Sequence, residues 1–360
     1  MLTQLEQWTG AVVCEVQCEA ATGALDAPDV IAALAYPDLV GLPQPGDVVV
    51  VNVTALERGL GTGGLGLVVI VEGRLPTASA PPAGGHLVKA RYTPQQTMVL
   101  GVDEQGSPHH ATLAEADSLD GLPVVVADLH SALPAIVAGL RERAPDAAVA
   151  YLMTDGGALP LAFSRTVATL RAAGWLACAI SVGQAFGGDL EAVTVHTALL
   201  AAAHVVRADV AIVAQGPGNL GTGTPWGFSG VAAGEAANAA GVLGGRPVAS
   251  LRVSGADLRE RHRGVSHHSR TAYGRVALVR AAVPVPVLDG ELGALVDRQA
   301  QALVDASAGR LSRHDVDLDG LEAALRGSPV TLSTMGRGYA DDPASFLAAA
   351  AAGRYAASLL

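Results

Sequence analysis

The chain has 360 residues, which leaves room for one very large domain or two ordinary ones. Its 23 lysines and arginines stand against 34 aspartates and glutamates, and the formal charge of −11 argues against a surface built to bind nucleic acid or an anionic membrane. Half of the residues are apolar and only 16% are charged, which excludes intrinsic disorder and indicates extensive burial in a covered sheet or a subunit interface.

Targeting and membrane signals are absent from the sequence. The first residues contain neither a basic segment nor an apolar leader. The longest uncharged apolar stretch, residues 192–206, is shorter than the ~20 residues that a membrane span needs. We therefore expect a cytoplasmic protein with no membrane partner.

The first third of the chain is typical of β-structure. Short runs rich in β-branched residues, separated by glycine- and proline-rich turns, occupy residues 12–18, 43–55, 65–73, 85–93 and 97–104. Such runs at short spacing predict a small antiparallel barrel or sandwich over residues 1–118.

From residue 119 onward the expected strands alternate with helices. Apolar runs predict strands at residues 121–130, 148–155, 175–182, 208–215 and 246–254, with a sixth within 275–289. The stretches between them predict helices at 131–143, 159–174, 189–206 and 228–244, and two more helices follow the last strand. This order predicts a Rossmann-like α/β domain over residues 119–360, with a doubly wound, mostly parallel sheet covered by helices on both faces.

Polar residues gather where the expected strands end, whereas the opposite loops are ordinary turns. Ligands of open α/β sheets bind outside the carboxyl ends of the strands, so this asymmetry predicts a functional site. The candidate catalytic residues share an ability to exchange protons or bind metal, and they are Asp128, His130, Asp155, Asp189, His267 and His268.

Some of these residues also have plain structural interpretations. Asp189 suits the N-cap of the expected helix over 189–206, and Asp155 suits a turn. Neighbouring side chains in an extended segment point apart, so only one of His267 and His268 is expected in the site. No H-x-x-E-H or C-x-x-C spacing supports a metal, so a divalent ion stays open and no cofactor is assigned.

A glycine-rich segment at residues 216–224 follows one expected strand and precedes a helix. It matches G-x-G-x-x-G but departs from the dinucleotide fingerprint at Pro217, in the inserted TGTPWG, and in lacking an acidic residue at the next strand end. We expect an anion cradle made by Gly216, Gly218, Gly221, Thr222 and Thr224. A nicotinamide cofactor and a purely structural packing loop remain alternatives. A second match, over residues 59–64, precedes a strand and is interpreted as a glycine turn.

Residues 259–269 form the densest polar stretch of the chain. Three arginines, Arg259, Arg261 and Arg263, and three histidines lie within these eleven residues. Guanidinium groups bind anions through paired donors, so we expect a clamp for an anionic ligand, with a solvated basic loop as the alternative.

Several long motifs resemble those of an uncharacterised bacterial family that is classed as a domain of unknown function. They include GHLVKARYTPQQ, YLMTDGGALPLA, AFGGDLEAV, QGPGNLGTGTPWGFSG and ADLRERHRGVSHHS. The resemblance covers nearly the whole chain. It implies no activity and no catalytic residue.

These patterns favour an enzyme, a hydrolase or transferase, that acts on an anionic or phosphorylated small molecule by Asp/His acid–base chemistry or metal-activated water. A non-catalytic ligand-binding or scaffolding protein and an NAD(P)-dependent enzyme remain alternatives, so whether the chain is an enzyme stays open. Alanine-rich helices with little polar surface predict a homodimer.

Overall fold

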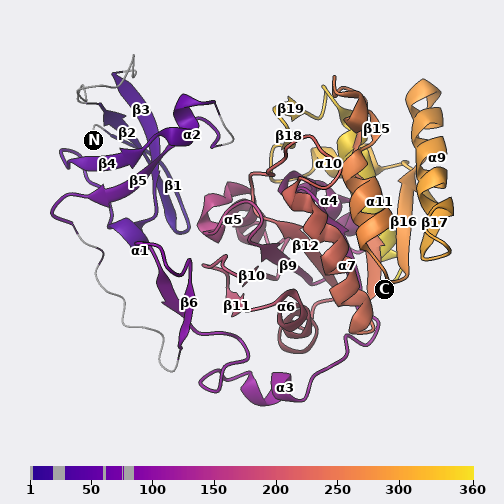
Figure 1. Ribbon diagram of the computed structural model, residues 1–360, viewed down its shortest axis with the longest axis horizontal. Helices are drawn as coiled ribbons and strands as arrows, with labels where there is room; N and C mark the ends of the chain where they lie inside the picture. The colour runs from indigo at the N-terminus through magenta and orange to yellow at the C-terminus, as the bar shows by residue number, and fades with distance from the viewer. Residues whose placement is uncertain (1–2, 19–28, 60–61, 75, 77–84) are drawn as a thin grey trace. The chain divides into compact units, whose positions relative to one another are not determined.

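The computed structural model describes residues 3–18, 29–59, 62–74, 76 and 85–360, which form two compact units (Figure 1). One unit comprises Met1–Ala83 and Ala90–Met98, and the other comprises Gly84–Lys89 and Val99–Leu360. Residues 99–118, which we assigned to the β-rich domain from the sequence, lie in the second unit. Their apolar side chains Val102 and Leu113 pack into that unit's core. Residues 60 and 61 of the expected glycine turn lie outside the described part.

The first unit contains a small mixed sheet. Its five strands are arranged in the order β1-β2-β3-β5-β4, with β3 and β5 parallel and the other neighbours antiparallel, so the expected purely antiparallel arrangement is wrong. The expected strand over residues 12–18 is confirmed, and its residues Val12, Cys14 and Val16 are buried in the core of this unit. The elements are β1 (Thr3–Trp8), β2 (Ala11–Gln17), β3 (Val30–Ala35), α1 (Pro37–Val40), β4 (Val49–Asn52), α2 (Thr54–Glu57) and β5 (Gly66–Val71).

The second unit is built on an eight-stranded parallel sheet with the order β11-β10-β9-β12-β8-β13-β16-β17. The prediction of a doubly wound α/β fold is confirmed. The strands are β8 (Pro123–Ala127), β9 (Val149–Thr154), β10 (Cys178–Val182), β11 (Leu190–Ala192), β12 (Val210–Gln215), β13 (Arg246–Ala249), β16 (Ala281–Pro286) and β17 (Leu311–Val316). Shorter elements outside this sheet are β6 (Leu87–Lys89), β7 (Thr97–Val99) and α3 (His110–Ala114).

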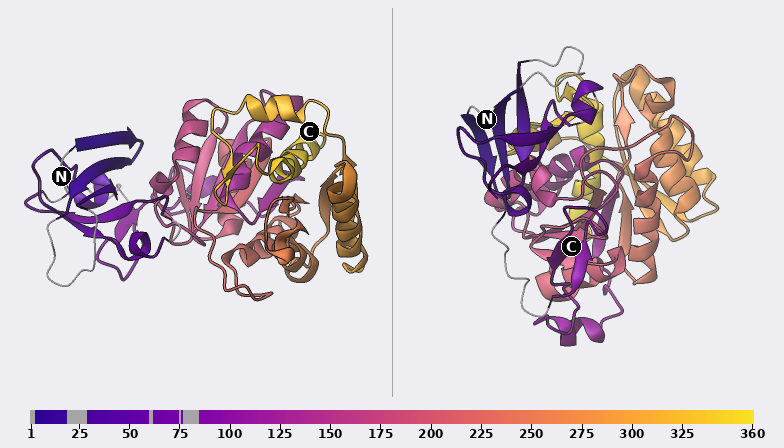
Figure 2. Two further views of the ribbon diagram at one scale, coloured as in Figure 1. Left: turned by 90° about the horizontal axis from the view of Figure 1, so that it is seen from above. Right: turned by 60° about the vertical axis from the view of Figure 1, so that its left-hand side comes forward.

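Helices cover both faces of this sheet (Figure 2). Along β8, Val124 and Val126 face one layer of core while Val125 and Ala127 face the other, as a strand buried on both sides requires. One layer contains α6 (Val195–Ala201), α7 (Ala232–Val242) and α9 (Gly290–Asp305). The other contains α4 (Leu133–Arg143), α5 (Arg165–Ala172), α10 (Leu321–Arg326) and α11 (Pro343–Ala357).

Two glycines let α4 and α11 approach each other closely. A Cβ atom at Gly139 would lie 2.0 Å from the Ala350 carbonyl oxygen, and one at Gly353 would lie 1.9 Å from that of Ile136. Both distances are far below van der Waals contact, so only glycine fits at either position. The expected C-terminal helix thus docks on α4 through backbone-to-backbone packing.

The strand order places a topological switch point between β8 and β12. From β8 the chain crosses through α4 to β9, and from β12 it crosses in the other direction through α7 to β13. The two crossover helices lie on opposite faces, so the carboxyl ends of β8 and β12 diverge into separate loops. In open α/β sheets this position is where ligands bind. No helix in the described part of the chain is long and apolar enough to cross a lipid bilayer.

Candidate functional site

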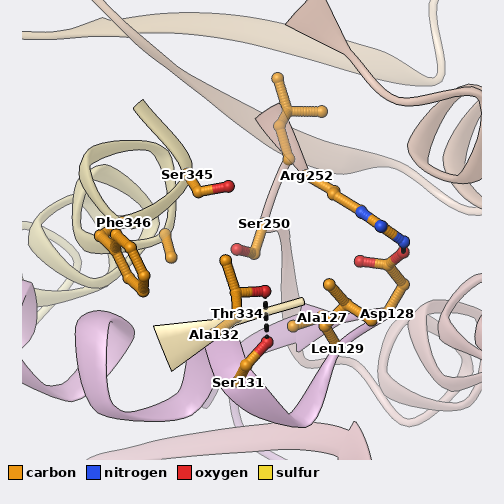
Figure 3. Close-up of a pocket in the computed structure, with 12 residues that line it drawn as sticks. Ala127, Asp128, Leu129, Ser131, Ala132, Ser250, Arg252, Thr334, Ser345 and Phe346 are labelled. Carbon is orange, nitrogen blue, oxygen red and sulfur yellow. Dashed lines mark hydrogen bonds and ion pairs between the residues drawn. The ribbon is translucent and has the colours of Figure 1, made fainter. Parts of the chain in front are cut away.

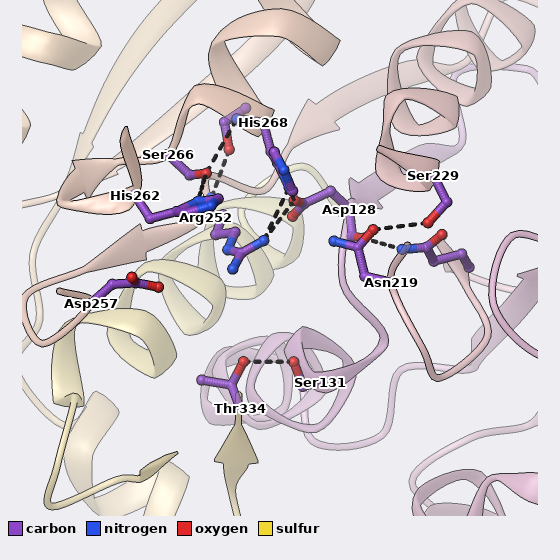
Figure 4. Close-up of polar contacts among 12 residues, drawn as sticks. Asp128, Ser131, Asn219, Ser229, Arg252, Asp257, His262, Ser266, His268 and Thr334 are labelled. Atoms are coloured by element: carbon purple, nitrogen blue, oxygen red, sulfur yellow. Dashed lines mark hydrogen bonds and ion pairs between the residues drawn. The ribbon is translucent and has the colours of Figure 1, made fainter. Parts of the chain in front are cut away.

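The residue at the centre of the candidate site is Asp128, which follows β8 directly. Its carboxylate is 3% exposed, and Oδ2 lies 3.2 Å from Nδ1 of His268 and 3.8 Å from Nη1 of Arg252. Figure 4 shows the three side chains pointing toward one another. At the backbone, the Gln215 side-chain amide donates to the Asp128 carbonyl over 2.8 Å, which joins the ends of β8 and β12.

Arg252 and His268 reach Asp128 because the segment between them folds back on itself. The antiparallel strands β14 (Val253–Ser254) and β15 (Gly264–Val265) close this segment, and the Ser266 N–H donates to the Arg252 carbonyl over 2.8 Å. Helix α8 (His267–Thr271) then begins with Ser266 as its N-cap, whose hydroxyl accepts from the His268 N–H. The start of α8 is thereby fixed beside the end of β13.

Three histidines, His262, His267 and His268, lie against one another next to the Asp128 carboxylate. Their ring centroids are 4.4–5.0 Å apart, and ring nitrogens of all three fall within 4.8 Å of one another. His268 also stacks on Phe228, with centroids 3.8 Å apart and planes inclined by 4°. We call Asp128, Arg252 and these three histidines the Asp128 cluster.

Burial keeps two imidazoles of the cluster neutral at neutral pH. Desolvation is the main cause that lowers the pKa of His262 to about 3, and the charge of Arg252 adds to it. Desolvation likewise lowers the pKa of His267 to about 4, with a smaller contribution from His268. Neutral imidazoles can accept a proton or bind a metal ion through an unprotonated nitrogen.

A narrow pocket opens beside Asp128 and Arg252 (Figure 3). About 20 Å³ of it is accessible to the centre of a water molecule, which is room for roughly one water. Hydroxyl groups line one side, where Ser131 and Thr334 are hydrogen-bonded over 2.9 Å. The pocket suits one small polar group of a ligand, not a whole nucleotide.

His130 lies outside the cluster and is satisfied within the core. Its Nε2 is 2.7 Å from the Ser164 hydroxyl and its Nδ1 is 2.9 Å from the Tyr151 hydroxyl, which in turn donates to the Ala214 carbonyl. One neutral tautomer satisfies this whole chain of bonds, with Ser164 donating to Nε2 and Nδ1–H donating to Tyr151. Burial lowers the pKa of His130 to about 4. The geometry is that of a structural histidine.

Asp155 and Asp189, two of the predicted catalytic residues, also lie outside the Asp128 cluster. Asp155 follows β9 and is exposed, and its carboxylate accepts from the Gln184 N–H over 3.0 Å. Asp189 lies at the amino end of β10, where it pairs with Arg171 at 3.0 Å and accepts from the Ala179 N–H. The interpretation of Asp189 as a helix N-cap is wrong, because the chain continues from it into β11 and helix α6 begins only at Val195.

The glycine segment over 216–224 forms a compact loop instead of leading directly into a helix. The Thr222 N–H donates to the Gly227 carbonyl, and the Gly227 N–H donates to the Thr224 hydroxyl. Helix α7 starts at Ala232, so the glycines do not sit at its first turn as they do in a dinucleotide fingerprint. Gly216, Gly218 and Gly221 lie in this loop with both threonines, and positive φ angles occur at Gly218 (+96°) and Gly223 (+81°).

The three predicted clamp arginines have different surroundings. Arg259 is bound to the Asp257 carboxylate through Nε and Nη2 at 2.9 and 2.7 Å, which satisfies its charge. Arg261 and Arg263 are exposed. A Cβ atom at Gly223 would lie 3.6 Å from Nη2 of Arg261, so this guanidinium borders the glycine loop.

The sequence therefore placed Asp128 and His268 at the edge where the structure brings them together, but it missed four of their neighbours. Gln215 ends β12 and Arg252 lies three residues after the end of β13, so both were detectable by their positions near strand ends. His262 carries no spacing signal, because an irregular segment brings it to His267. Phe228 was expected only to pack the loop, and its stacking on the His268 ring depends on the tertiary fold.

Comparison with known proteins places the chain in a family. No curated protein and no solved structure matches it. The model of DUF3866, described as a protein of unknown function, matches residues 32–353 and confirms the resemblance carried by the sequence motifs. Because this match covers most of the sequence, the chain belongs to the DUF3866 family.

Proposed function

We propose that this protein is an enzyme that hydrolyses a small anionic molecule, a phosphate ester, at the Asp128 cluster. The observation that carries the proposal is the buried contact between the Asp128 carboxylate and the His268 ring, beside the Arg252 guanidinium, at the switch point of the sheet. Acid–base groups and a cationic anion receptor are the two parts that such a reaction needs.

Arg252 supplies the receptor for the anion. Its side chain is only 8% exposed, and it lies 3.0 Å from Nδ1 of His268. A planar guanidinium binds phosphate oxygens through two parallel donors, and partial burial strengthens the interaction. Arg261, exposed beside the glycine loop, adds a second positive charge for the outer part of the substrate.

The histidines promote attack by water. Nδ1 of His268 lies 3.2 Å from the Asp128 carboxylate and 3.0 Å from Nη1 of Arg252, which can only donate. The reaction uses the tautomer in which Nδ1–H is donated to Asp128, so that Nε2 is the basic nitrogen and Asp128 stabilises the positive charge that the ring acquires. The water loses a proton to the imidazole group as its oxygen forms the new P–O bond. The P–O bond to the leaving group breaks, and the leaving oxygen takes up a proton, so the products are an alcohol and phosphate.

Rate measurements on a panel of phosphate esters test this function. We expect wild-type protein to hydrolyse at least one ester, with kcat/KM reduced about 100-fold or more in Asp128→Asn and in His268→Ala. His314→Ala, at a histidine that contacts Tyr355 away from the cluster, serves as the matched control and should retain its rate. Binding of the esters without turnover would contradict an enzymatic function and indicate a ligand-binding protein. Equal rates in wild type and both variants would show that hydrolysis does not take place at the Asp128 cluster.

The proposal also includes a cytoplasmic location and a two-fold dimer. The low charge fraction of 16% leaves little polar surface for water to solvate. Light scattering at micromolar concentration should give about twice the chain mass of 36.2 kDa. A mass equal to that of one chain would contradict the dimer.

A further inference from the structure

We infer that His262, His267 and His268 form a binding site for one divalent transition-metal ion. They are the one group of potential metal ligands that the described residues bring together, with a ring nitrogen from each within 4.8 Å of the other two. Binding of the ion stands by itself, whereas its use in catalysis rests on the function proposed above.

The spacing of the three rings fits a shared ion. Imidazoles that radiate from a tetrahedral zinc ion, with Zn–N bonds of about 2.0–2.1 Å, have centroids about 5 Å apart. The observed separations are 4.9 Å for His262 and His267, 5.0 Å for His262 and His268, and 4.4 Å for His267 and His268. Small ring rotations would bring the ligand nitrogens from their present spacing to the roughly 3.4 Å expected around zinc.

Two of the rings have a partner for the nitrogen that would not bind the ion. Nδ1 of His268 lies 3.2 Å from the Asp128 carboxylate and 3.0 Å from Nη1 of Arg252, and the Ser266 hydroxyl lies 2.8 Å from Nδ1 of His262. The tautomers that suit an ion are those in which His268 donates Nδ1–H to Asp128 and His262 donates Nδ1–H to Ser266. A carboxylate or hydroxyl on the second nitrogen of a ligating histidine fixes its tautomer and orientation. In this arrangement Nε2 of both rings carries the lone pair that a metal requires.

The third ring has a nitrogen that the protein leaves unsatisfied. Nε2 of His267 is buried and has no hydrogen-bond partner among the described residues. A buried polar atom without a partner is costly, and a bound ion removes that cost. This observation is independent of the ring spacing, and it favours a ligand in the centre of the cluster.

The segment that carries His262 is held in place by α9. The Gln299 side-chain oxygen accepts from the Val265 N–H over 2.6 Å, and it lies 2.2 Å from the position that a Cβ atom at Gly264 would take. Gly264 has a φ of +70°, so a glycine is needed both for the backbone conformation and for this close approach. The histidines are therefore preorganised before an ion binds.

The chemistry of the ligands favours zinc and similar ions. Neutral imidazoles select Zn²⁺, Co²⁺ or Ni²⁺ over Mg²⁺ or Ca²⁺, which prefer oxygen. Three protein ligands leave a fourth position for water, the arrangement of catalytic zinc sites. An ion there would lower the pKa of the bound water to about 7. It would then activate this water for attack, which is the role that the proposed function gives to the histidines. Arg252 opposes the ion electrostatically, and the adjacent Asp128 carboxylate offsets its charge.

Titration of chelator-treated, tag-free protein with Co²⁺ tests the site, because tetrahedral Co²⁺ has strong visible absorption. We expect one equivalent to bind per chain and to be displaced by Zn²⁺. His262→Gln and His267→Gln should each weaken binding at least 100-fold, while His314→Ala binds as wild type. Circular dichroism of each variant establishes that it is folded, and His262→Ala and His267→Ala provide a second pair. Absence of Co²⁺ binding by wild type, or unchanged binding in folded variants, would overturn the site.

The same preparations separate this inference from the proposed function. Stoichiometric Co²⁺ binding by a protein that hydrolyses no phosphate ester would support the site and overturn the function. Ester hydrolysis at full rate by metal-free protein would support the function and overturn the catalytic use of the ion.

Discussion

Oδ2 of Asp128 lies 3.2 Å from Nδ1 of His268, although 140 residues separate the two in the sequence. Asp128 directly follows the strand at the switch point, and His268 lies in the first turn of α8. Their contact joins the central strand β8 to the irregular segment that follows β13. The cluster is thus assembled by the sheet topology together with one returning loop.

Replacing Asp128 by asparagine should weaken metal binding by 10- to 100-fold. Asparagine keeps the shape of the side chain but removes the charge that orients the His268 ring. Co²⁺ titration of the variant measures the loss. Asp209→Asn is a suitable control, because Asp209 accepts from the Ala148 N–H at the opposite end of the sheet. An unchanged affinity in Asp128→Asn would mean that the carboxylate does not support the ligand.

Ser266→Ala should lower both stability and metal affinity. The change removes the N-cap of α8, which costs about 1 kcal/mol, and it removes the hydroxyl beside His262. Denaturant unfolding and Co²⁺ titration measure the two effects separately. Thr194→Ala removes the corresponding cap of α6 and should reduce stability by a similar amount with no effect on Co²⁺. Equal Co²⁺ affinities in the two variants would show that Ser266 only caps the helix.

Arg252→Lys should raise KM for a phosphate ester about tenfold and change kcat less. Lysine keeps the positive charge but has no planar pair of donors for the phosphate oxygens. Arg313→Lys, at an arginine paired with Asp297 and Asp315, tests for general effects of the substitution. A fall in kcat with no change in KM would instead indicate that Arg252 acts in the transition state only.

The free energy of unfolding should depend on pH in the way that a buried, neutral His130 requires. Burial lowers its pKa to about 4 in the folded protein, whereas the ordinary pKa of histidine is 6.5, so between these pH values the unfolded chain binds more protons. Stability therefore falls as the pH falls through this window, and this residue should account for about 2 kcal/mol between pH 7 and pH 5.

His130→Gln tests that assignment. The variant starts from lower stability because it loses the bonds to Ser164 and Tyr151. Its further loss between pH 7 and pH 5 should be about 2 kcal/mol smaller than that of wild type, measured by denaturant unfolding of metal-free protein. The same loss in both proteins would show that His130 is not held neutral.

Much of this fold was predictable because the central strands are continuous apolar runs. β8 and β12 consist of residues that suit a strand covered on both faces, and their ends placed Asp128 and Gln215 at one edge. The edge strand β17 was missed, since its sequence LSRHDV is polar and resembles a loop. β11 was missed because its three residues continue into a helical pattern.

The site was harder to predict than the sheet. Asp189 follows a glycine pair at which the chain returns to the amino end of β10 within a few residues, and no periodicity signals that return. The expectation that only one of His267 and His268 would lie in the site assumed that this segment is extended. Both rings join the cluster because these residues begin α8, where consecutive side chains are about 100° apart.

An anomalous-difference map from a crystal grown with zinc, recorded at the zinc absorption edge, tests the central claim most directly. We expect one strong peak per chain, about 2.0–2.1 Å from a ring nitrogen of each of His262, His267 and His268, with Asp128 still bound to His268. Zinc bound elsewhere, with these three rings left without an ion, would contradict it.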